Sequence, residues 1–96
     1  MIKSGIENLL LSKTTMKILI LLYRSGKPLT RYQLMKRLSL NYSILSERLE
    51  SLKSIGFIEV YSQKPIRYKL SEKLKYDAKY KPLLEYLHFL SNFIRL

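Results

Sequence analysis

The sequence contains no cysteine, a single histidine and only three glycines. Without cysteine the chain can form no disulfide, no thiolate metal site and no thiol redox centre. Three scattered glycines do not make a glycine-rich phosphate-binding loop. The one histidine, His88, lies in an apolar stretch, which favours a packing role over catalysis or metal binding. We therefore expect no metal, no cofactor and no enzymatic activity.

Acidic residues are also scarce. The sequence has 7 Asp and Glu against 18 Lys and Arg, which gives a formal net charge of +11. The few carboxylates are scattered, without the paired spacing of a general acid–base or metal site. A folded domain this basic repels itself unless an anion binds it, and nucleic acid is the commonest such partner. The alternative is a basic surface that serves solubility alone.

Long apolar runs are missing as well. The longest, Ile18–Tyr23, is far too short to cross a bilayer. Lysines interrupt the apolar residues near the N-terminus and no small-residue cleavage site follows, so we expect no signal peptide and a cytoplasmic protein. With 96 residues, 47% of them hydrophobic, the chain is predicted to form one small globular domain.

The most informative stretch is 41–55, which reads as a helix with two different faces. Asn41 can cap its first turn, and Gly56 suits the left-handed residue that follows many helices. Leucines recur with helical spacing on the face predicted to point into the core: Leu45, Leu49 and Leu52. The opposite face carries small or polar residues: Tyr42, Ser43, Ser46, Glu47 and Glu50.

Capping signals predict three helices before this one. Ser4 and Glu7 have capping-box spacing and predict a helix over 5–11, and Ser12 can cap a helix over 13–24. That second helix is apolar around nearly its whole circumference and must be covered on several sides. One of these sides could be covered by a second subunit, or the helix could simply be the central core helix, and both can hold together. Thr30 and Gln33 form another capping box, which opens a helix over 31–38. Its inward residues are Leu34, Met35 and Leu38. Joined by Ser39-Leu40, the helices 31–38 and 41–55 form a predicted helix-turn-helix.

Two strands are predicted after this pair of helices. Residues 57–61 and 66–70 are β-branched and aromatic with alternating polarity, and Ser62-Gln63-Lys64-Pro65 joins them as a hairpin. The residues expected to face the core are Ile58, Val60, Ile66, Tyr68 and Leu70. Those expected to point outward are Lys64, Arg67 and Lys69.

In this order of elements the chain resembles the winged helix-turn-helix transcription regulators, the broad group that includes the MarR-like and ArsR-like repressors. The resemblance rests on LTRYQLMKRLSLNYSILSERLESLKSIGFIEV and on the later RYKLSEK. It implies an α+β, mostly helical fold with a two-stranded wing and a C-terminal dimerisation helix. Residues 1–96 would form a single winged-helix domain, with a core over 12–73 and helical extensions over 1–11 and 82–96. The small size and the Lys, Ile and Tyr usage resemble archaeal or archaeal-virus regulators.

The resemblance also implies a way of binding double-stranded DNA. Helix 41–55 would enter the major groove, and the wing over 57–70 would reach the flanking minor groove or backbone. The residues implied at the base edges are Tyr42, Ser43, Ser46 and Glu47. Those implied at the backbone are Arg31, Tyr32, Lys36, Arg48, Lys64 and Arg67. Glu47 could accept from a cytosine amino group or pair with Arg37 or Arg48. We favour pairing, because an unpaired carboxylate near phosphates is repelled.

The C-terminal part predicts a dimer interface. Pro82 suits the first turn of a helix, here over 82–94. Its apolar seam, predicted as the dimer interface, consists of Leu83, Leu87, Leu90 and Ile94, and it is widened by Leu84, Tyr86, Phe89 and Phe93. One small core would not bury so wide a face, so we expect a symmetric homodimer. Binding to a membrane surface is less favoured, because the polar face has few basic residues. The lysines and tyrosines of 73–81 could be a basic stripe or a solvated linker.

The sequence therefore predicts a homodimeric, sequence-specific DNA-binding regulator. Repression by occupying an operator is favoured over activation, since we see no spare domain for recruiting polymerase. Two alternatives remain open: a non-specific architectural DNA-binding protein, and a winged helix used for protein–protein contact. RNA binding is less favoured because no exposed sheet with stacking aromatics is evident. A small-molecule effector cannot be identified from the sequence.

Overall fold

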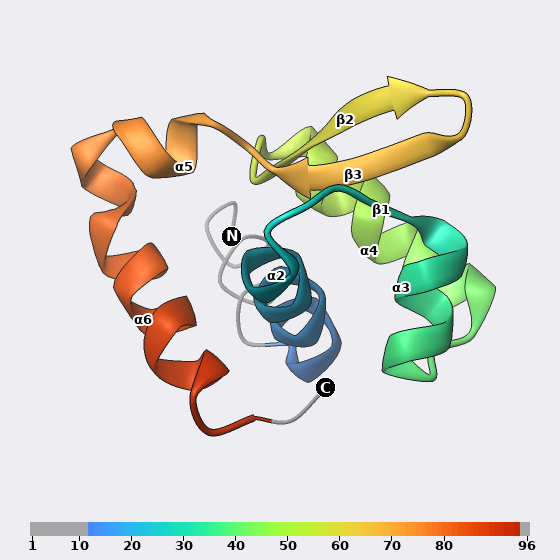
Figure 1. The fold of residues 1–96 in the computed structure, drawn as a ribbon, viewed down its shortest axis with the longest axis horizontal. Helices are drawn as coiled ribbons and strands as arrows, with labels where there is room; N and C mark the ends of the chain where they lie inside the picture. The colour runs from blue at the N-terminus through green and yellow to red at the C-terminus, as the bar shows by residue number, and fades with distance from the viewer. Residues whose placement is uncertain (1–11, 95–96) are drawn as a thin grey trace, which may run out of the picture.

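The computed structural model describes residues 12–94. Their elements, shown in Figure 1, follow one another in the order α2 (Lys13–Ser25), β1 (Leu29–Thr30), α3 (Arg31–Leu38), α4 (Tyr42–Ser54), β2 (Ile58–Gln63), β3 (Ile66–Leu70), α5 (Lys73–Tyr76), the 3-10 helix η1 (Ala78–Tyr80) and α6 (Lys81–Ser91). The helix predicted over 5–11 lies outside the described residues. The predicted mixture of helices with a small antiparallel sheet is confirmed.

The helix starts are the ones that the capping residues predicted. The Ser12 hydroxyl accepts from the Thr15 amide, and the Asn41 side chain accepts from the Ile44 amide at 3.1 Å. Thr30 and Gln33 form the complete capping box of α3. Gly56 has a φ of 82° directly beyond α4, a left-handed conformation that glycine adopts without a steric penalty. These local signals determine where α2, α3 and α4 begin along the chain.

The sheet has three antiparallel strands in the order β1-β3-β2, one more than predicted. The additional strand, β1, lies within the segment predicted as an extended link, and it pairs Leu29 with Tyr68. Strand β2 begins at Ile58 and runs to Gln63, rather than over 57–61. Val60 pairs with Tyr68 and Ser62 with Arg67, so Tyr61 between them forms a β-bulge.

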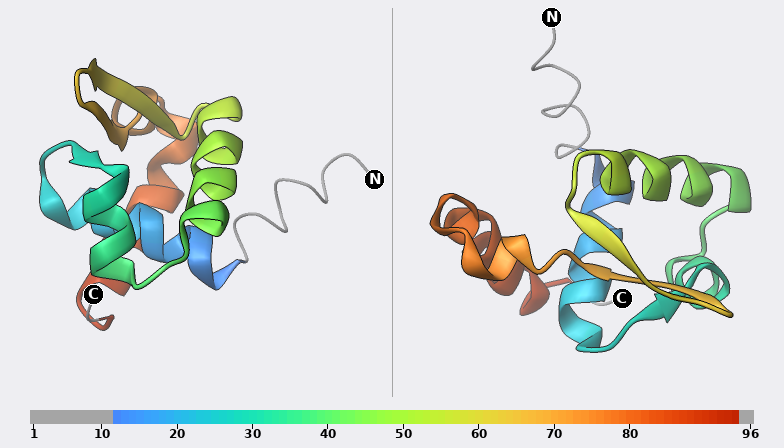
Figure 2. Two further views of the ribbon diagram at one scale, coloured as in Figure 1. Left: turned by 90° about the vertical axis from the view of Figure 1, so that its right-hand side faces the viewer. Right: turned by 90° about the horizontal axis from the view of Figure 1, so that it is seen from above.

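Helix α2 lies at the centre of the molecule (Figure 1), with α6 on one side and α3 and α4 on the other. It contacts α6, α3 and β3, and its residues Ile18, Leu19 and Ile20 are fully buried. The prediction that this helix must be covered on several sides is confirmed, and elements of its own chain provide much of that cover. Two further views show the hairpin of β2 and β3 extending away from this core beside α3 and α4 (Figure 2).

The structure corrects two predictions about which side chains face the core. Leu87, placed at the predicted dimer interface, is fully buried in its own chain, and Leu83, Leu90 and Ile94 pack against the same core. The seam of α6 therefore faces inward. Helix α6 also ends at Ser91 rather than at Ile94. In the wing, Ile66 is 44% exposed instead of buried, because the hairpin tip extends beyond the core that covers Tyr68.

Candidate nucleic-acid interface

Helices α3 and α4 pack together as the predicted helix-turn-helix. Between them Ser39 adopts a left-handed conformation with a φ of 53°, which reverses the chain within three residues. The α4 leucines point into the core, as predicted: Leu45, Leu49 and Leu52. The other side of α4 is exposed, and Tyr42 at its first turn is 58% exposed. The fold thus presents a short polar helix face at the surface.

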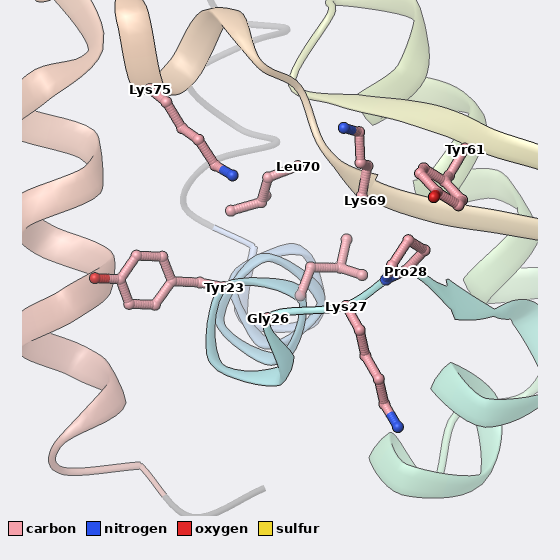
Figure 3. Close-up of a pocket in the computed structure, with 9 residues that line it drawn as sticks. Tyr23, Gly26, Lys27, Pro28, Tyr61, Lys69, Leu70 and Lys75 are labelled. Atoms are coloured by element: carbon pink, nitrogen blue, oxygen red, sulfur yellow. The ribbon is translucent and has the colours of Figure 1, made fainter.

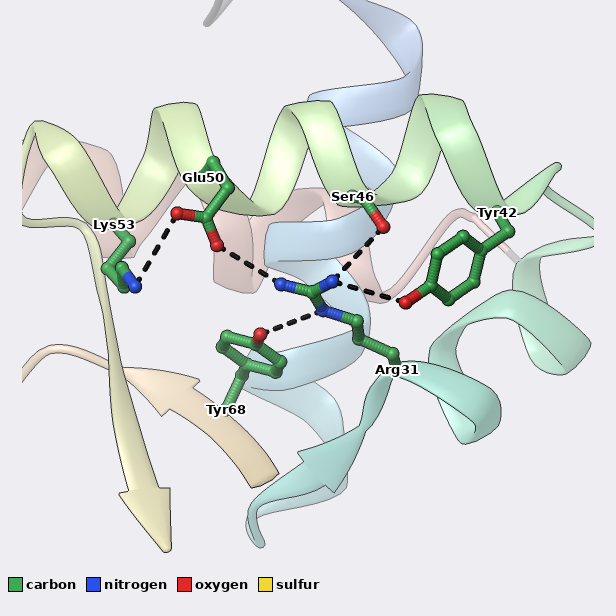
Figure 4. A network of polar contacts seen from close by, with 6 residues as sticks. All are labelled: Arg31, Tyr42, Ser46, Glu50, Lys53 and Tyr68. Atoms are coloured by element: carbon green, nitrogen blue, oxygen red, sulfur yellow. Dashed lines mark hydrogen bonds and ion pairs between the residues drawn. The ribbon is translucent and has the colours of Figure 1, made fainter. Parts of the chain in front are cut away.

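Arg31, the first residue of α3, connects this face to the sheet (Figure 4). Its Nε donates to the Tyr68 hydroxyl on β3 at 2.8 Å. Its Nη1 donates to the hydroxyls of Tyr42 at 3.4 Å and Ser46 at 3.2 Å. Its Nη2 donates to Glu50 Oε2 at 3.1 Å. One guanidinium therefore joins α3, three residues of α4, and β3.

These contacts also change the acidity of the groups involved. Burial disfavours the charge of Arg31, but the hydrogen bonds to Tyr42 and Tyr68 outweigh it and raise the pKa of the guanidinium. In the other direction, the Arg31 guanidinium lowers the pKa of the Tyr42 phenol. A hydrogen bond with Ser46 lowers the pKa of Tyr42 further. Because the hydroxyls of Tyr42 and Ser46 both accept from Arg31, neither donates its proton to this guanidinium.

The acidic residues of α4 are paired. Glu47 lies 3.4 Å from Arg48, one of the two partners considered from the sequence, and Glu50 pairs with Arg31 and, at 3.5 Å, with Lys53. The Glu47 side chain is mostly exposed, so its pairing with Arg48 contributes little energy and is easily exchanged for another contact. Ser43 is also exposed on this helix.

The outer side of α3 carries two of the residues predicted at the DNA backbone, Tyr32 and Lys36. Tyr32 is exposed, and the Lys36 ammonium group lies 5.7 Å from the centre of its ring. Such a contact between a cation and an aromatic ring is worth about 0.5–1 kcal/mol at an exposed site. Lys36 and Arg37 are both exposed. This side of α3 is therefore a positively charged surface next to the turn that precedes α4.

The wing tip carries positive charge that the described part of the chain does not compensate. Lys64 is exposed and Arg67 half-buried, and neither forms an ion pair with a carboxylate of residues 12–94. Lys69, nearer the base of the hairpin, lies 2.6 Å from Glu72 and 3.6 Å from Glu59. Of the three basic residues predicted to point outward from the wing, Lys64 and Arg67 are therefore better suited than Lys69 to contact an anion.

A pocket of about 300 Å³ lies away from this face, between the end of α2, strand β3 and helix α5 (Figure 3). The Tyr23 hydroxyl at its edge points toward α6 and contacts His88. Lys69 is already paired with glutamates, and Lys27 points away, so the Lys75 ammonium group is the charge that extends toward the pocket. Specific ligand sites have several converging polar groups, and this pocket has fewer.

Residues 12–94 contain neither a candidate metal site nor a candidate membrane span. No group of three His, Asp or Glu side chains there could hold a metal ion. None of the helices in this range combines the length and the apolar character that crossing a membrane requires.

The predicted site residues fall into two groups in the structure. Arg31, Tyr42 and Ser46 come together around one guanidinium, whereas Glu47, Lys64 and Arg67 lie outside that network. Tyr68 belongs to the network but was predicted only as a core residue of its strand. Its alternating position indicated burial, and no signal in the sequence pointed to the contact of its hydroxyl with Arg31.

The arrangement of α3, α4 and the β2–β3 hairpin is a winged helix-turn-helix fold. Among solved structures the chain is similar to HlyU from Vibrio cholerae N16961, with a TM-score of 0.69 and 25% sequence identity over 92% of this chain and 89% of that chain. This likeness confirms the winged-helix fold and supports the resemblance to winged helix-turn-helix regulators. No protein-family model matches the sequence, and no curated protein matches it.

Proposed function

We propose that the protein is a DNA-binding transcription regulator that recognises a specific double-stranded sequence. The observation that carries this proposal is the combination of an exposed polar face on α4 with a basic wing tip, where Lys64 and Arg67 form no ion pair with a carboxylate of residues 12–94. Helix-turn-helix proteins place the second helix of the motif in the major groove. The likeness to HlyU supports the fold on which this comparison depends.

In the proposed complex, α4 reads base edges and the basic residues hold the backbone. The hydroxyls of Tyr42, Ser43 and Ser46 can reach hydrogen-bonding atoms in the major groove, and Glu47 can exchange Arg48 for a cytosine amino group. Lysine and arginine on α3 and the wing contribute affinity by displacing counterions, without reading sequence. The residues proposed at the backbone are Tyr32 and Lys36 of α3, Arg48 of α4, and Lys64 and Arg67 of the wing.

We further propose a cytoplasmic homodimer that represses transcription by occupying its site. Because the leucine seam of α6 faces inward, we propose as the interface an outward row on α6 and the turn that follows it. This row, which we call the aromatic row, consists of Tyr86, Phe89 and Phe93, all exposed. A two-fold dimer would place two recognition helices about 34 Å apart, one turn of DNA. We propose no catalytic activity.

Selection from a pool of random duplexes tests the function. The protein would be mixed with the pool, and the bound DNA amplified and sequenced over several rounds. We expect enrichment of one shared sequence with inverted-repeat symmetry. Enrichment of a sequence without that symmetry would contradict the two-fold dimer. Recovery of DNA without any shared sequence would contradict specific recognition and favour an architectural protein.

Titration of the enriched duplex and of a scrambled duplex at two salt concentrations completes the test. We expect a preference for the enriched duplex that persists at the higher salt, because base contacts release few counterions. Equal and steeply salt-dependent binding of both duplexes would indicate an architectural protein. Absence of binding to either would favour the use of this winged helix for protein–protein contact.

A further inference from the structure

The Arg31 guanidinium has few donors left for a DNA phosphate. A guanidinium has five N–H donors, and Arg31 commits four of them, one from Nε to Tyr68, two from Nη1 to Tyr42 and Ser46, and one from Nη2 to Glu50. Its charge is compensated by the Glu50 carboxylate at 3.1 Å. A cation that is already paired in the protein gains little by moving to a phosphate. Arg31 thus differs from Lys64 and Arg67, which have no such partner among the described residues.

Tyr68, which accepts from Arg31 Nε, is the most firmly held residue of this network. Tyr68 is only 2% exposed, and it lies on the central strand, opposite Leu29 of β1 and Val60 of β2. A buried tyrosine hydroxyl needs a hydrogen-bonding partner, and Arg31 Nε provides it at 2.8 Å. The guanidinium carbon also lies 5.6 Å from the centre of the Tyr68 ring. The sheet therefore holds the Nε side of the Arg31 guanidinium, while its Nη1 and Nη2 atoms contact α4.

The other end of the network holds the two hydroxyls proposed to read bases. Tyr42 and Ser46 lie one turn apart on α4, and both accept from the same nitrogen, Nη1. Their oxygen atoms are therefore placed relative to each other and to β3, which forms one strand of the wing. Since both accept from Arg31, the pair still has a hydroxyl proton to donate to an acceptor atom of a base, such as guanine O6 or N7.

We propose that Arg31 is a positioning residue, which sets the recognition hydroxyls of α4 in a fixed relation to the wing strand β3, and that it does not act as a phosphate ligand. This inference rests on the proposed function. It replaces the sequence-based expectation that Arg31 lies at the DNA backbone. A site that reads base edges requires donors held within a fraction of an ångström, and a planar, forked side chain can hold several at once.

Two variants test the proposal, each measured with the enriched and the scrambled duplex. Arg31→Lys keeps the positive charge but loses the planar fork, and Tyr68→Phe removes only the buried hydroxyl that anchors Arg31. We expect both to reduce the preference for the enriched duplex by about tenfold, comparable to one mismatched base pair. Binding of the scrambled duplex should change little. Because Tyr68 is buried, the effect of its substitution cannot come from a direct interaction between this side chain and DNA.

Two controls separate positioning from general damage. Tyr23→Phe removes a hydroxyl from a tyrosine on α2, where no recognition residue lies, and should leave the preference unchanged. Thermal unfolding of each variant would show that it is folded at the temperature of the titration. A preference that falls in Arg31→Lys and Tyr68→Phe but not in Tyr23→Phe supports the proposal.

The opposing outcomes are distinct. If the unmodified protein prefers the enriched duplex and both variants keep that preference, Arg31 does not position the site and the inference is wrong. If Arg31→Gln lowers the salt dependence of log Kd by about 0.9 per log unit of salt, Arg31 is a phosphate ligand and the inference is also wrong. If the unmodified protein enriches no sequence, the proposed function itself has failed.

Discussion

The hydroxyl of Tyr23 on α2 lies 3.0 Å from Nδ1 of His88 on α6, which joins residues 65 positions apart in the sequence. The two rings meet edge to face, with their centres 6.1 Å apart. Together with the inward Leu87, this contact packs α6 onto α2 of the same chain. The single histidine thus packs against another helix, but it is exposed on α6 and not part of the buried core.

Removing the Tyr23 hydroxyl should weaken this attachment slightly. In Tyr23→Phe the ring packing remains but the hydrogen bond to His88 is absent, and we expect the free energy of unfolding to fall by about 0.5–1.5 kcal/mol. Urea unfolding followed by circular dichroism measures the change. Tyr76→Phe is the matched control, because Tyr76 is exposed outside α6 and outside the aromatic row, and it should show no loss of stability. Equal effects of the two variants would contradict the assigned role.

Shortening the Leu87 side chain should lower the free energy of unfolding far more than Tyr23→Phe does. Its side chain is fully buried against the core, and Leu87→Ala would leave a cavity that typically destabilises a protein by about 2–5 kcal/mol. Urea unfolding at one fixed protein concentration would show the decrease. Glu85→Ala on the exposed side of α6 should stay within about 0.5 kcal/mol of the unmodified protein. A small effect of Leu87→Ala would mean that the seam does not face α2.

The aromatic row should instead control the oligomeric state. Phe89 is 56% exposed and its ring centre lies 4.8 Å from that of Phe93. A charge placed there would be buried in a two-fold interface, so we expect Phe89→Lys to convert the dimer to a folded monomer, as measured by light scattering. The control Tyr76→Lys, at an exposed position outside α6, should remain a dimer. A dimer that survives Phe89→Lys would place the interface elsewhere.

The ion pair at the base of the wing predicts a loss of stability in acid. Lys69, 2.6 Å away, lowers the pKa of the Glu72 carboxyl below its ordinary value of 4.5. The stabilisation is therefore complete above 4.5, and it disappears as the pH falls through the lowered pKa of the folded state. In Glu72→Gln the free energy of unfolding should fall less over this acid range. In the comparison variant Glu85→Gln the free energy of unfolding should fall with pH as it does in the unmodified protein. Urea unfolding over this range of pH measures the difference between Glu72→Gln and Glu85→Gln.

The wing should contribute affinity without specificity. Arg67→Gln removes a charge that no carboxylate of the described residues pairs with, so binding of the enriched and the scrambled duplex should weaken to a similar extent. The slope of log Kd against log salt should fall by about 0.9 for each DNA phosphate that the variant no longer neutralises. Lys64→Gln, at the tip of the hairpin, should behave in the same way. A change in the preference between the two duplexes would instead mean that the wing reads sequence.

The local part of this fold could be predicted from the sequence. Capping residues such as Ser12, Thr30 and Asn41 act on amides three residues away, so their effect is visible in a short stretch of chain. Strand β1 could not be found in this way, because its two residues are too few to show alternation. It also pairs with β3, where Leu29 lies opposite Tyr68, and this partner is far along the chain. The exposure of Ile66 also escaped prediction, since alternation shows which face of a strand a residue occupies but not how far the core extends.

The site could be predicted only in part, because some of its contacts join residues that are far apart in the sequence. The polar face of α4 follows from helical periodicity within one segment. The role of Arg31 depends on Tyr68, 37 residues further along the chain, and no pattern in the sequence links the two. Helix α6 shows the same limit. Its apolar residues indicated a need for cover, but only the packing shows that α2 covers the leucines while the aromatic row remains exposed.

The β-bulge at Tyr61 has a consequence for solubility. In the strand order β1-β3-β2, strand β2 is an outer strand of the sheet, and its outer backbone groups could pair with a strand of another molecule. A bulge adds local twist and interrupts the regular ladder, which makes such edge-to-edge pairing harder. In this chain the extra residue of the bulge is Tyr61. Deleting it would restore a flat, regular edge on a hairpin that extends away from the core.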